Sequence, residues 1–174
     1  LLVRQEATEM AIFHLSVKII SRSKGQSAIA SAAYRSGDKL HDERYDENQD
    51  YTNKRFIEHS EIQLPENAPQ KYLDRATLWN SVEKAEKAKN AQLAREVELA
   101  LPRELSAEQR IKLVHDYVQK SFVNQGMIAD WSIHNPQPDK DNPNKPANPH
   151  AHIMLTMRSL RSDGSWAPTQ KSTY

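Results

Sequence analysis

The stretch AIFHLSVKIISRSKGQSAIASAAYRSG, residues 11–37, decides how this chain folds. Its first ten residues, 11–20, alternate in polarity and are rich in β-branched and aromatic side chains, which predicts a strand. The polar residues that follow include Gly25 and predict a turn. Ser27 is a favourable N-cap, and it opens an alanine-rich helix that Gly37 is expected to end.

Outward from this unit, strand-like and helix-like segments continue along the chain. Strands are expected at 56–64, 92–101, 127–134 and 151–158. Helices are expected over 71–89 and from a capping box at Ser106 and Gln109 up to Gly126, and residues 38–54 are expected to form a loop or a short helix. Asp163-Gly164 is typical of a hairpin turn. These elements predict an α+β fold, with a mainly antiparallel central sheet and helices packed on one face.

Composition sets limits on function. The 174 residues are enough for one domain with a full core, and the net charge of +1 neither supports nor excludes nucleic acid as a partner. The chain has no cysteine, which excludes disulfides, thiolate metal sites and cysteine nucleophiles. The acidic stretch after the first helix is expected to be a solvated loop; its members are Asp42, Glu43, Asp46, Glu47 and Asp50.

The ends of the chain carry two further expectations. Met10 is the expected natural start, so residues 1–9 are expected to be upstream or added sequence. One domain is expected over 10–174, cut short at its C-terminal end. We see no membrane-spanning run and no signal peptide, and therefore expect a cytoplasmic protein without membrane insertion.

A second stretch, NPHAHIML at 148–155, indicates a metal site. Successive side chains of a strand point to opposite faces, so His150 and His152 project from the same side. His134 ends another predicted strand and returns to the pair through a polar loop. Imidazole is a common ligand for divalent metals, and the three residues together predict a metal centre.

Tyr34 is the candidate nucleophile. It continues a stripe of Ser27 and Ser31 on an otherwise small-residue helix. It is either an amphipathic tyrosine at the edge of the core or a phenol held out for attack. With a pKa near ~10, a phenol needs a base or a polarised electrophile, and a metal could supply the second. Glu96 and Glu98 share one face of a predicted strand, and either could point into the site or into solvent.

Three blocks carry a family resemblance. They are MAIFHLSVKIISRSKGQSAIASAAYRSGDKL at 10–40, AREVELALP at 94–102, and SIHNP with NPHAHIMLTMR at 132–136 and 148–158. In these blocks the chain resembles the MobA/MobL family of conjugative relaxases, within the wider group of HUH endonucleases. The resemblance implies a relaxase-like palm fold. It also implies nicking of one DNA strand at a transfer origin by a tyrosine, which leaves a 5′-phosphotyrosyl adduct and a free 3′-OH that can be rejoined.

Carried over residue by residue, the resemblance assigns a role to each candidate. The nucleophile falls on Tyr34, the metal ligands on His134, His150 and His152, and the acidic helper on Glu96, with Glu98 as its rival. Candidate contacts to the DNA backbone are Arg22, Lys24, Gln26, Ser27 and Arg35. The implied cofactor is a divalent ion, Mn or Mg in use, with Zn, Ni or Co suited to three imidazoles. The implied partners are single-stranded plasmid DNA, accessory relaxosome proteins and a secretion coupling protein.

Three other interpretations stay open from the residues. A rolling-circle replication initiator would use a tyrosine that follows the histidine pair, and Tyr174 does so. A zinc hydrolase would use a metal-bound hydroxide and no covalent intermediate. A DNA-binding module without catalysis would use the histidines only to stabilise its fold.

Overall fold

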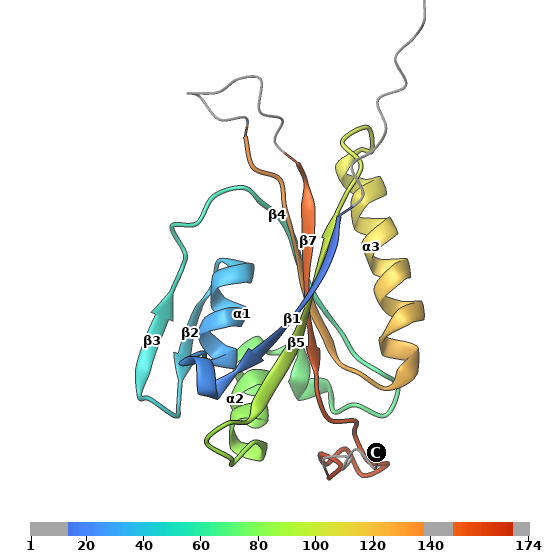
Figure 1. Cartoon of the computed structure of the whole chain (residues 1–174). Helices are drawn as coiled ribbons and strands as arrows, with labels where there is room; N and C mark the ends of the chain where they lie inside the picture. The colour runs from blue at the N-terminus through green and yellow to red at the C-terminus, as the bar shows by residue number, and fades with distance from the viewer. Residues whose placement is uncertain (1–13, 138–147, 169–174) are drawn as a thin grey trace, which may run out of the picture.

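The computed structural model describes residues 14–137 and 148–168. Its centre is a five-stranded sheet in the order β1-β5-β7-β6-β4, in which every neighbouring pair is antiparallel. The strands are β1 (Leu15–Ser21), β4 (Ile57–Gln63), β5 (Gln92–Ala100), β6 (Ala129–His134) and β7 (His150–Thr156). Figure 1 shows this sheet upright through the middle of the molecule. The predicted α+β class with a mainly antiparallel sheet is confirmed. The expected upstream residues 1–9, Met10 and Tyr174 lie outside the described residues.

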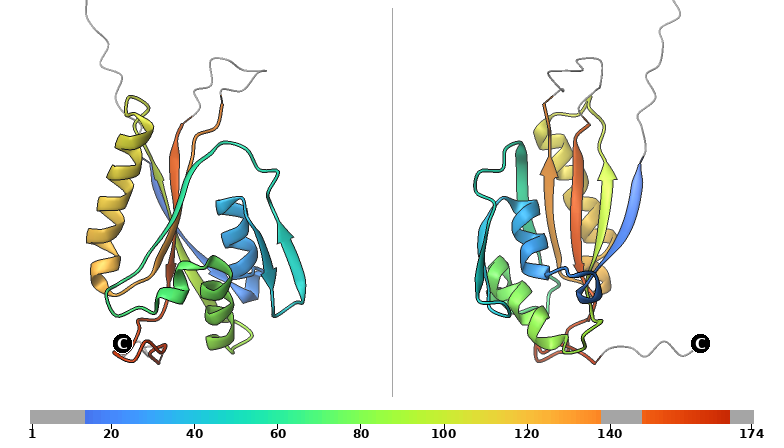
Figure 2. Two further views of the ribbon diagram at one scale, coloured as in Figure 1. Left: turned by 180° about the vertical axis from the view of Figure 1, so that it is seen from behind. Right: turned by 60° about the vertical axis from the view of Figure 1, so that its left-hand side comes forward.

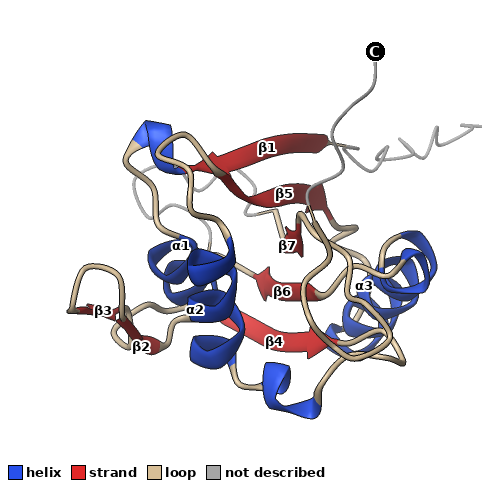
Figure 3. Cartoon of the chain, turned by 90° about the horizontal axis from the view of Figure 1, so that it is seen from below, coloured by secondary structure: helices blue, strands red, loops and turns tan. Residues whose placement is uncertain are grey.

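Helices cover both faces of the sheet, so the prediction of helices on one face was wrong. Helices α1 (Ala28–Ser36) and α2 (Arg75–Ala85) lie on one face and α3 (Ala107–Ser121) on the other, as Figure 3 shows from below. Side chains from β7 enter both layers: Met154 packs in the core of α1 and α2, whereas Ile153 and Leu155 pack in the core of α3. The unbroken apolar run of β7 was the signal for a strand buried on both faces.

The helix ends follow from local side-chain chemistry, although two of the predicted helices have other boundaries in the structure. The Ser27 side chain accepts a hydrogen bond from the Ala30 N–H, and the capping box of Ser106 and Gln109 is present. α3 ends at Ser121, and Gly126 ends the short helix η3 (Val123–Gln125) instead. The predicted helix over 71–89 is divided at Asp74, which follows η2 (Gln70–Leu73) and caps α2 through the Thr77 N–H. A side chain that caps a helix begins it there, so the chain before Asp74 forms a separate turn.

A hairpin of β2 (Lys39–Asp42) and β3 (Glu47–Asp50) replaces the expected loop or short helix. Figure 2 shows it against α1, on the side away from the sheet. Four of the five acidic residues of this stretch are exposed as expected, but Asp42 is buried. Its carboxylate accepts hydrogen bonds from the Ser27 hydroxyl and the Arg44 N–H, so it joins the hairpin turn to the start of α1. The predicted turn at Asp163-Gly164 is confirmed by the pairing of Leu160 with Trp166.

A buried charge network joins α2 to the sheet. The Arg75 guanidinium donates to the carboxylates of Asp130 on β6 and Asp38 after α1, and Trp79 donates its indole N–H to Asp130. Asp130 is therefore fully engaged in a dry environment, where loss of one partner costs far more than the pair itself contributes. No helix of the described residues is both long and apolar enough to cross a membrane.

Candidate active site

Strand register brings the three predicted histidines together. In the pairing of β6 with β7, His134 lies opposite His150, and Ser132 lies opposite His152. Opposite residues of an antiparallel pair project to the same face, here the face that carries α1. The ring centroids of the three imidazoles are 4.7 to 5.5 Å apart, and one ligand atom from each lies within 4.8 Å of the other two.

Each imidazole has one ring nitrogen engaged by an oxygen. Nδ1 of His152 lies 2.8 Å from the Glu96 carboxylate, Nδ1 of His150 lies 2.9 Å from the Asn148 carbonyl, and Nε2 of His134 lies 2.7 Å from the Arg35 carbonyl. Such contacts fix the ring and the tautomer and leave the second nitrogen as an electron-pair donor. Three oriented ring nitrogens at this spacing fit a divalent metal ion that accepts imidazole.

Glu96 is the carboxylate that hydrogen-bonds a histidine, although a Glu98 oxygen also lies within 4.8 Å of a ring nitrogen of His152. Glu98 lies directly opposite His152 in the sheet, but it is 27% exposed and pairs with Lys18 at 3.5 Å. Glu96 lies opposite Met154, two residues further along β7, and reaches His152 diagonally. The Arg35 guanidinium holds the Glu96 carboxylate there, with its Nε atom 2.7 Å from a carboxylate oxygen. Burial alone raises the pKa of Glu96, but the hydrogen bonds and charges of His152 and Arg35 outweigh it and hold the pKa at about 2.

Arg35 connects α1 to this cluster in two ways, because its side chain binds Glu96 and its carbonyl accepts a hydrogen bond from His134. Burial lowers the pKa of His134 to about 4, and the charges of His152, Lys54 and His150 add to this, against the opposing effect of the bond to the Arg35 carbonyl. His134 is therefore neutral at physiological pH, which is the form that binds a metal.

Tyr34 precedes Arg35 in the last turn of α1, and its side chain is 48% exposed. Its ring meets the ring of Tyr51 edge-on at 5.3 Å, and the Lys54 ammonium lies 3.4 Å from its centroid. Both neighbours come from the segment after β3. Neither neighbour was predicted from the sequence, since a contact across about twenty residues of polar chain leaves no periodic signal.

Four of the five residues predicted to contact DNA are hydrogen-bonded to other residues of the protein. The Arg22 guanidinium is buried against the Glu83 carboxylate and the carbonyls of Glu86 and Ala88. The remaining three of the four are likewise engaged: Gln26 accepts from the Ser21 N–H, Ser27 caps α1, and Arg35 holds Glu96. Lys24 is exposed. A phosphate contact needs a donor at the surface, whereas Arg22, Ser27 and Arg35 donate to the carboxylates of residues distant in sequence: Glu83, Asp42 and Glu96.

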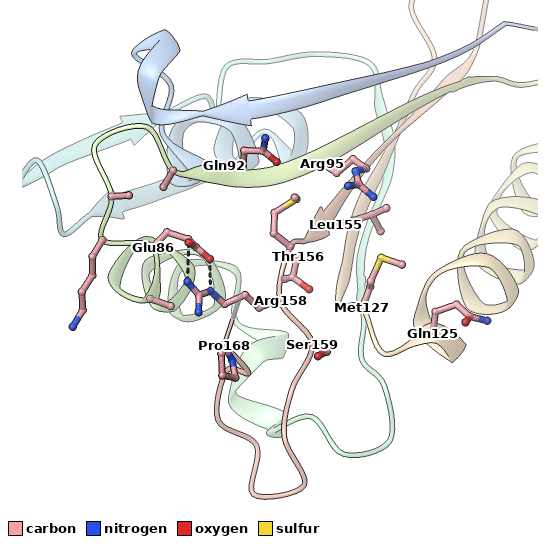
Figure 4. A pocket seen from close by; sticks show the side chains of 15 residues that line it. Glu86, Gln92, Arg95, Gln125, Met127, Leu155, Thr156, Arg158, Ser159 and Pro168 are labelled. Carbon is pink, nitrogen blue, oxygen red and sulfur yellow. Dashed lines mark hydrogen bonds and ion pairs between the residues drawn. The ribbon is translucent and has the colours of Figure 1, made fainter. Parts of the chain in front are cut away.

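A separate cleft of about 1010 Å³ lies at the far end of β7 from His150. Figure 4 shows its lining, with Arg95 and Leu155 on the strands and the ion pair of Arg158 with Glu86 at 2.5 and 3.0 Å on one side. It contains none of the predicted site residues.

Two solved structures have the same fold. One, described as "Molecular Basis of Vancomycin Resistance Transfer in Staphylococcus aureus", matches with a TM-score of 0.84 and 37% identity over 94% of this chain and 79% of that chain. The conjugative relaxase TrwC, in its metal-bound complex with oriT DNA, matches with a TM-score of 0.52 and 14% identity over 90% of this chain and 61% of that chain. This second likeness concerns the fold alone. This chain thus shares its fold with the conjugative relaxase TrwC.

The sequence relatives give the family. The pattern of the MobA/MobL family matches residues 26–173, and this chain belongs to that family. It is 44% identical over 167 residues to the conjugal transfer protein TraA of Agrobacterium fabrum, and 40% identical over 173 residues to the mobilization protein MobL of Acidithiobacillus ferridurans. These matches cover 89% and 90% of this chain, but only 14% of TraA and 45% of MobL.

Proposed function

We propose that this domain is the nicking part of a plasmid transfer relaxase, which cuts and rejoins one DNA strand at an origin of transfer. The observation that carries the proposal is the double contact of Arg35, with its side chain on Glu96 and its carbonyl on His134. These bonds fix the last turn of α1, which carries Tyr34, against the histidine cluster. Family membership supports DNA transfer as the setting.

In the proposed reaction the phenol oxygen of Tyr34 attacks one phosphorus atom of the strand. A Tyr34–phosphorus bond forms, the bond from phosphorus to the 3′ oxygen breaks, the phenol loses its proton and the 3′ oxygen gains one. The products are a 5′-phosphotyrosyl adduct and a free 3′-OH. The adduct stores the bond for rejoining, so the protein's main task is to hold both ends in line.

We assign His134, His150 and His152 as the ligands of a divalent ion, which when bound supplies a Lewis acid for the phosphate oxygens. Imidazoles favour Mn, Co, Ni or Zn over Mg, although availability could make Mg or Mn the ion in use. Glu96 accepts the Nδ1–H of His152 and so presents the Nε2 atom to the ion. Its role here is positioning, because its carboxylate is already committed to His152 and Arg35.

The proposed substrate is single-stranded plasmid DNA, with accessory relaxosome proteins and a secretion coupling protein as further partners. The net charge of +1 predicts modest electrostatic affinity and reliance on the shape of the DNA. Lys24 remains a candidate phosphate contact because it is exposed.

Covalent capture tests the nucleophile. The protein is incubated with a randomised single-stranded DNA pool and Mn²⁺, denatured in SDS, and the adduct is mapped to a peptide. We expect the adduct on Tyr34, and its loss in Tyr34→Phe. Tyr45→Phe is the matched control, because Tyr45 is 49% exposed and lies on the β2–β3 turn. An adduct on Tyr174 would instead support a replication initiator, and cleavage that survives Tyr34→Phe would support a zinc hydrolase.

Metal stoichiometry tests the ligand set. We expect His150→Ala to lose bound Mn²⁺ and adduct formation together, since two imidazoles hold the ion far less well than three. His41→Ala is the control, because His41 lies on the hairpin and is exposed. Full metal occupancy in His150→Ala would refute the assignment.

A further inference from the structure

Two of the last carbonyl groups of α1 are capped by side chains, one of which belongs to the candidate site. The C=O of Ala33 accepts the Gly37 N–H in the usual way. The next two carbonyls are taken by side chains: Lys54 donates to Tyr34 at 2.7 Å, and His134 contacts Arg35 at 2.7 Å. The C-terminal carbonyls of a helix have no partner inside the helix and carry partial negative charge, so a lysine ammonium there is doubly favourable.

The same ammonium also covers the face of the Tyr34 ring. Lys54 Nζ lies 3.4 Å from the ring centroid, and the Tyr51 ring closes a second side edge-on at 5.3 Å. A cation on the face of a phenol is attracted to its π-electrons, and an edge-on aromatic pair fixes ring orientation. Tyr34 is thus held at both its backbone and its ring, although its side chain is half exposed.

The segment that carries these two residues is itself fixed to the end of α1. The Tyr51 N–H donates to the Asp38 carbonyl at 3.1 Å, and the Lys54 N–H donates to the Tyr51 carbonyl at 2.9 Å. Thr52 bonds Asp50 through both its N–H and its hydroxyl. The turn from 51 to 54 is therefore joined by a backbone hydrogen bond to the chain just after the end of α1, and a second one closes it on itself.

The charge of Lys54 is retained at neutral pH. Burial, together with the charge of Arg35, lowers the pKa of Lys54 to about 8. The ammonium is partly withdrawn from bulk water by its contacts with the Tyr34 ring and carbonyl, which is a cost that an exposed lysine avoids by turning outward.

We infer that Lys54, supported by Tyr51, is a positioning residue for the nucleophilic phenol: it fixes the direction of the Tyr34 ring and sets a positive charge over the ring from which the attack begins. This inference rests on the proposed function of Tyr34. It adds a role for the β2–β3 hairpin, since the hairpin delivers the turn that holds the nucleophile.

Fluorine NMR tests the contact of Lys54 with the Tyr34 ring in the absence of DNA and metal. The six tyrosines are labelled with 3-fluorotyrosine, and Tyr34→Phe identifies the Tyr34 resonance. We expect Lys54→Met to move this resonance and Lys54→Arg to restore it in large part. Lys71→Met is the matched control, because Lys71 lies 5.4 Å from the Tyr72 centroid and should move only the Tyr72 signal. A Tyr34 resonance unchanged in Lys54→Met overturns the inference whether or not the protein nicks DNA.

Single-turnover kinetics test the consequence. We expect Lys54→Met to slow adduct formation by about tenfold, with the dissociation constant for the oligonucleotide unchanged, and Lys54→Arg to recover most of the rate. Normal adduct formation in Lys54→Met, with Tyr34→Phe inactive, would overturn the inference and leave the proposed function intact. Equal loss in Lys54→Met and Lys54→Arg, with a lower melting temperature in both, would show a purely structural role and overturn it too. Full activity in Tyr34→Phe would refute the proposed function itself. The fluorine NMR experiment would still report whether Lys54 contacts the Tyr34 ring.

Discussion

Replacement of Glu96 by glutamine isolates the charge that joins α1 to the histidine cluster. The pKa of Glu96 falls from 4.5 to about 2 in the folded protein, because the hydrogen bonds and charges of His152 and Arg35 outweigh its burial. At about 1.4 kcal/mol per unit, this shift corresponds to about 3 kcal/mol of stability for the ionised form. Since the folded pKa is depressed, the stabilisation is complete above pH 5 and is lost as the pH falls towards 2.

Glutamine is isosteric with a protonated glutamate, so it reproduces the acid form at every pH. We therefore expect Glu96→Gln to be about 3 kcal/mol less stable than the wild type at pH 6, and about 2 kcal/mol of that difference to disappear by pH 3. The assay is urea unfolding at a series of pH values, followed by fluorescence of the three tryptophans. Subtracting the free energy of unfolding of the variant from that of the wild type at each pH removes the contribution of the carboxylates that both proteins share.

Glu98→Gln is the matched control on the same strand and the same face. Its pair with Lys18 is long and exposed, so we expect a change below about 1 kcal/mol at every pH. A difference between wild type and Glu96→Gln that stays constant from pH 6 to pH 3 would refute the reasoning, because it would mean that the Glu96 charge does not hold the site together. A large effect in Glu98→Gln would exchange the roles of the two carboxylates.

Three further predictions concern stability without bound metal. Burial holds the pKa of His134 at about 4 against 6.5, so the metal-free protein should lose about 3 kcal/mol as the pH falls from 6.5 to 4, and His134→Asn should abolish that loss in thermal melts recorded with EDTA. Asp130→Ala should cost about 3–5 kcal/mol in urea unfolding, because it leaves the Arg75 guanidinium buried without its main partner; a cost below about 1 kcal/mol would contradict the buried network. Gly37→Ala should lower the melting temperature more than Gly25→Ala: both have a positive φ, but of the two only at Gly37 would a Cβ clash, with the Ile57 side chain, and equal effects would show that this contact relaxes freely.

Local patterns determined much of this protein. Strand-like segments of the sequence located all five strands of the central sheet, and caps at Ser27 and Ser106 located the starts of two helices, because strand-forming side chains and hydrogen bonds over three residues are properties of the chain itself. Strand parity, by which alternate side chains share a face, put His150 and His152 on one face. The resemblance in the blocks at 10–40, 94–102 and 148–158 added the family, which the comparisons confirm.

Tertiary structure decided between residues that strand parity cannot distinguish. Glu96 and Glu98 share a face, and nothing in AREVELALP separates them; Arg35, 61 residues earlier in the chain, draws Glu96 to His152. Arg35 was predicted to contact DNA, because the sequence around a cation near a predicted nucleophile does not show which carboxylate it will bind.

The hairpin and the second helical layer were decided in the same way. Residues 38–54 are too polar to carry an apolar period, and their strands form because they pack on α1, where Lys54 then meets Tyr34. The position of α3 followed from the second apolar face of the sheet. The sequence thus supplied the elements and the ligand types, whereas register and long-range charge pairing, which depend on residues far apart in the chain, assembled the site.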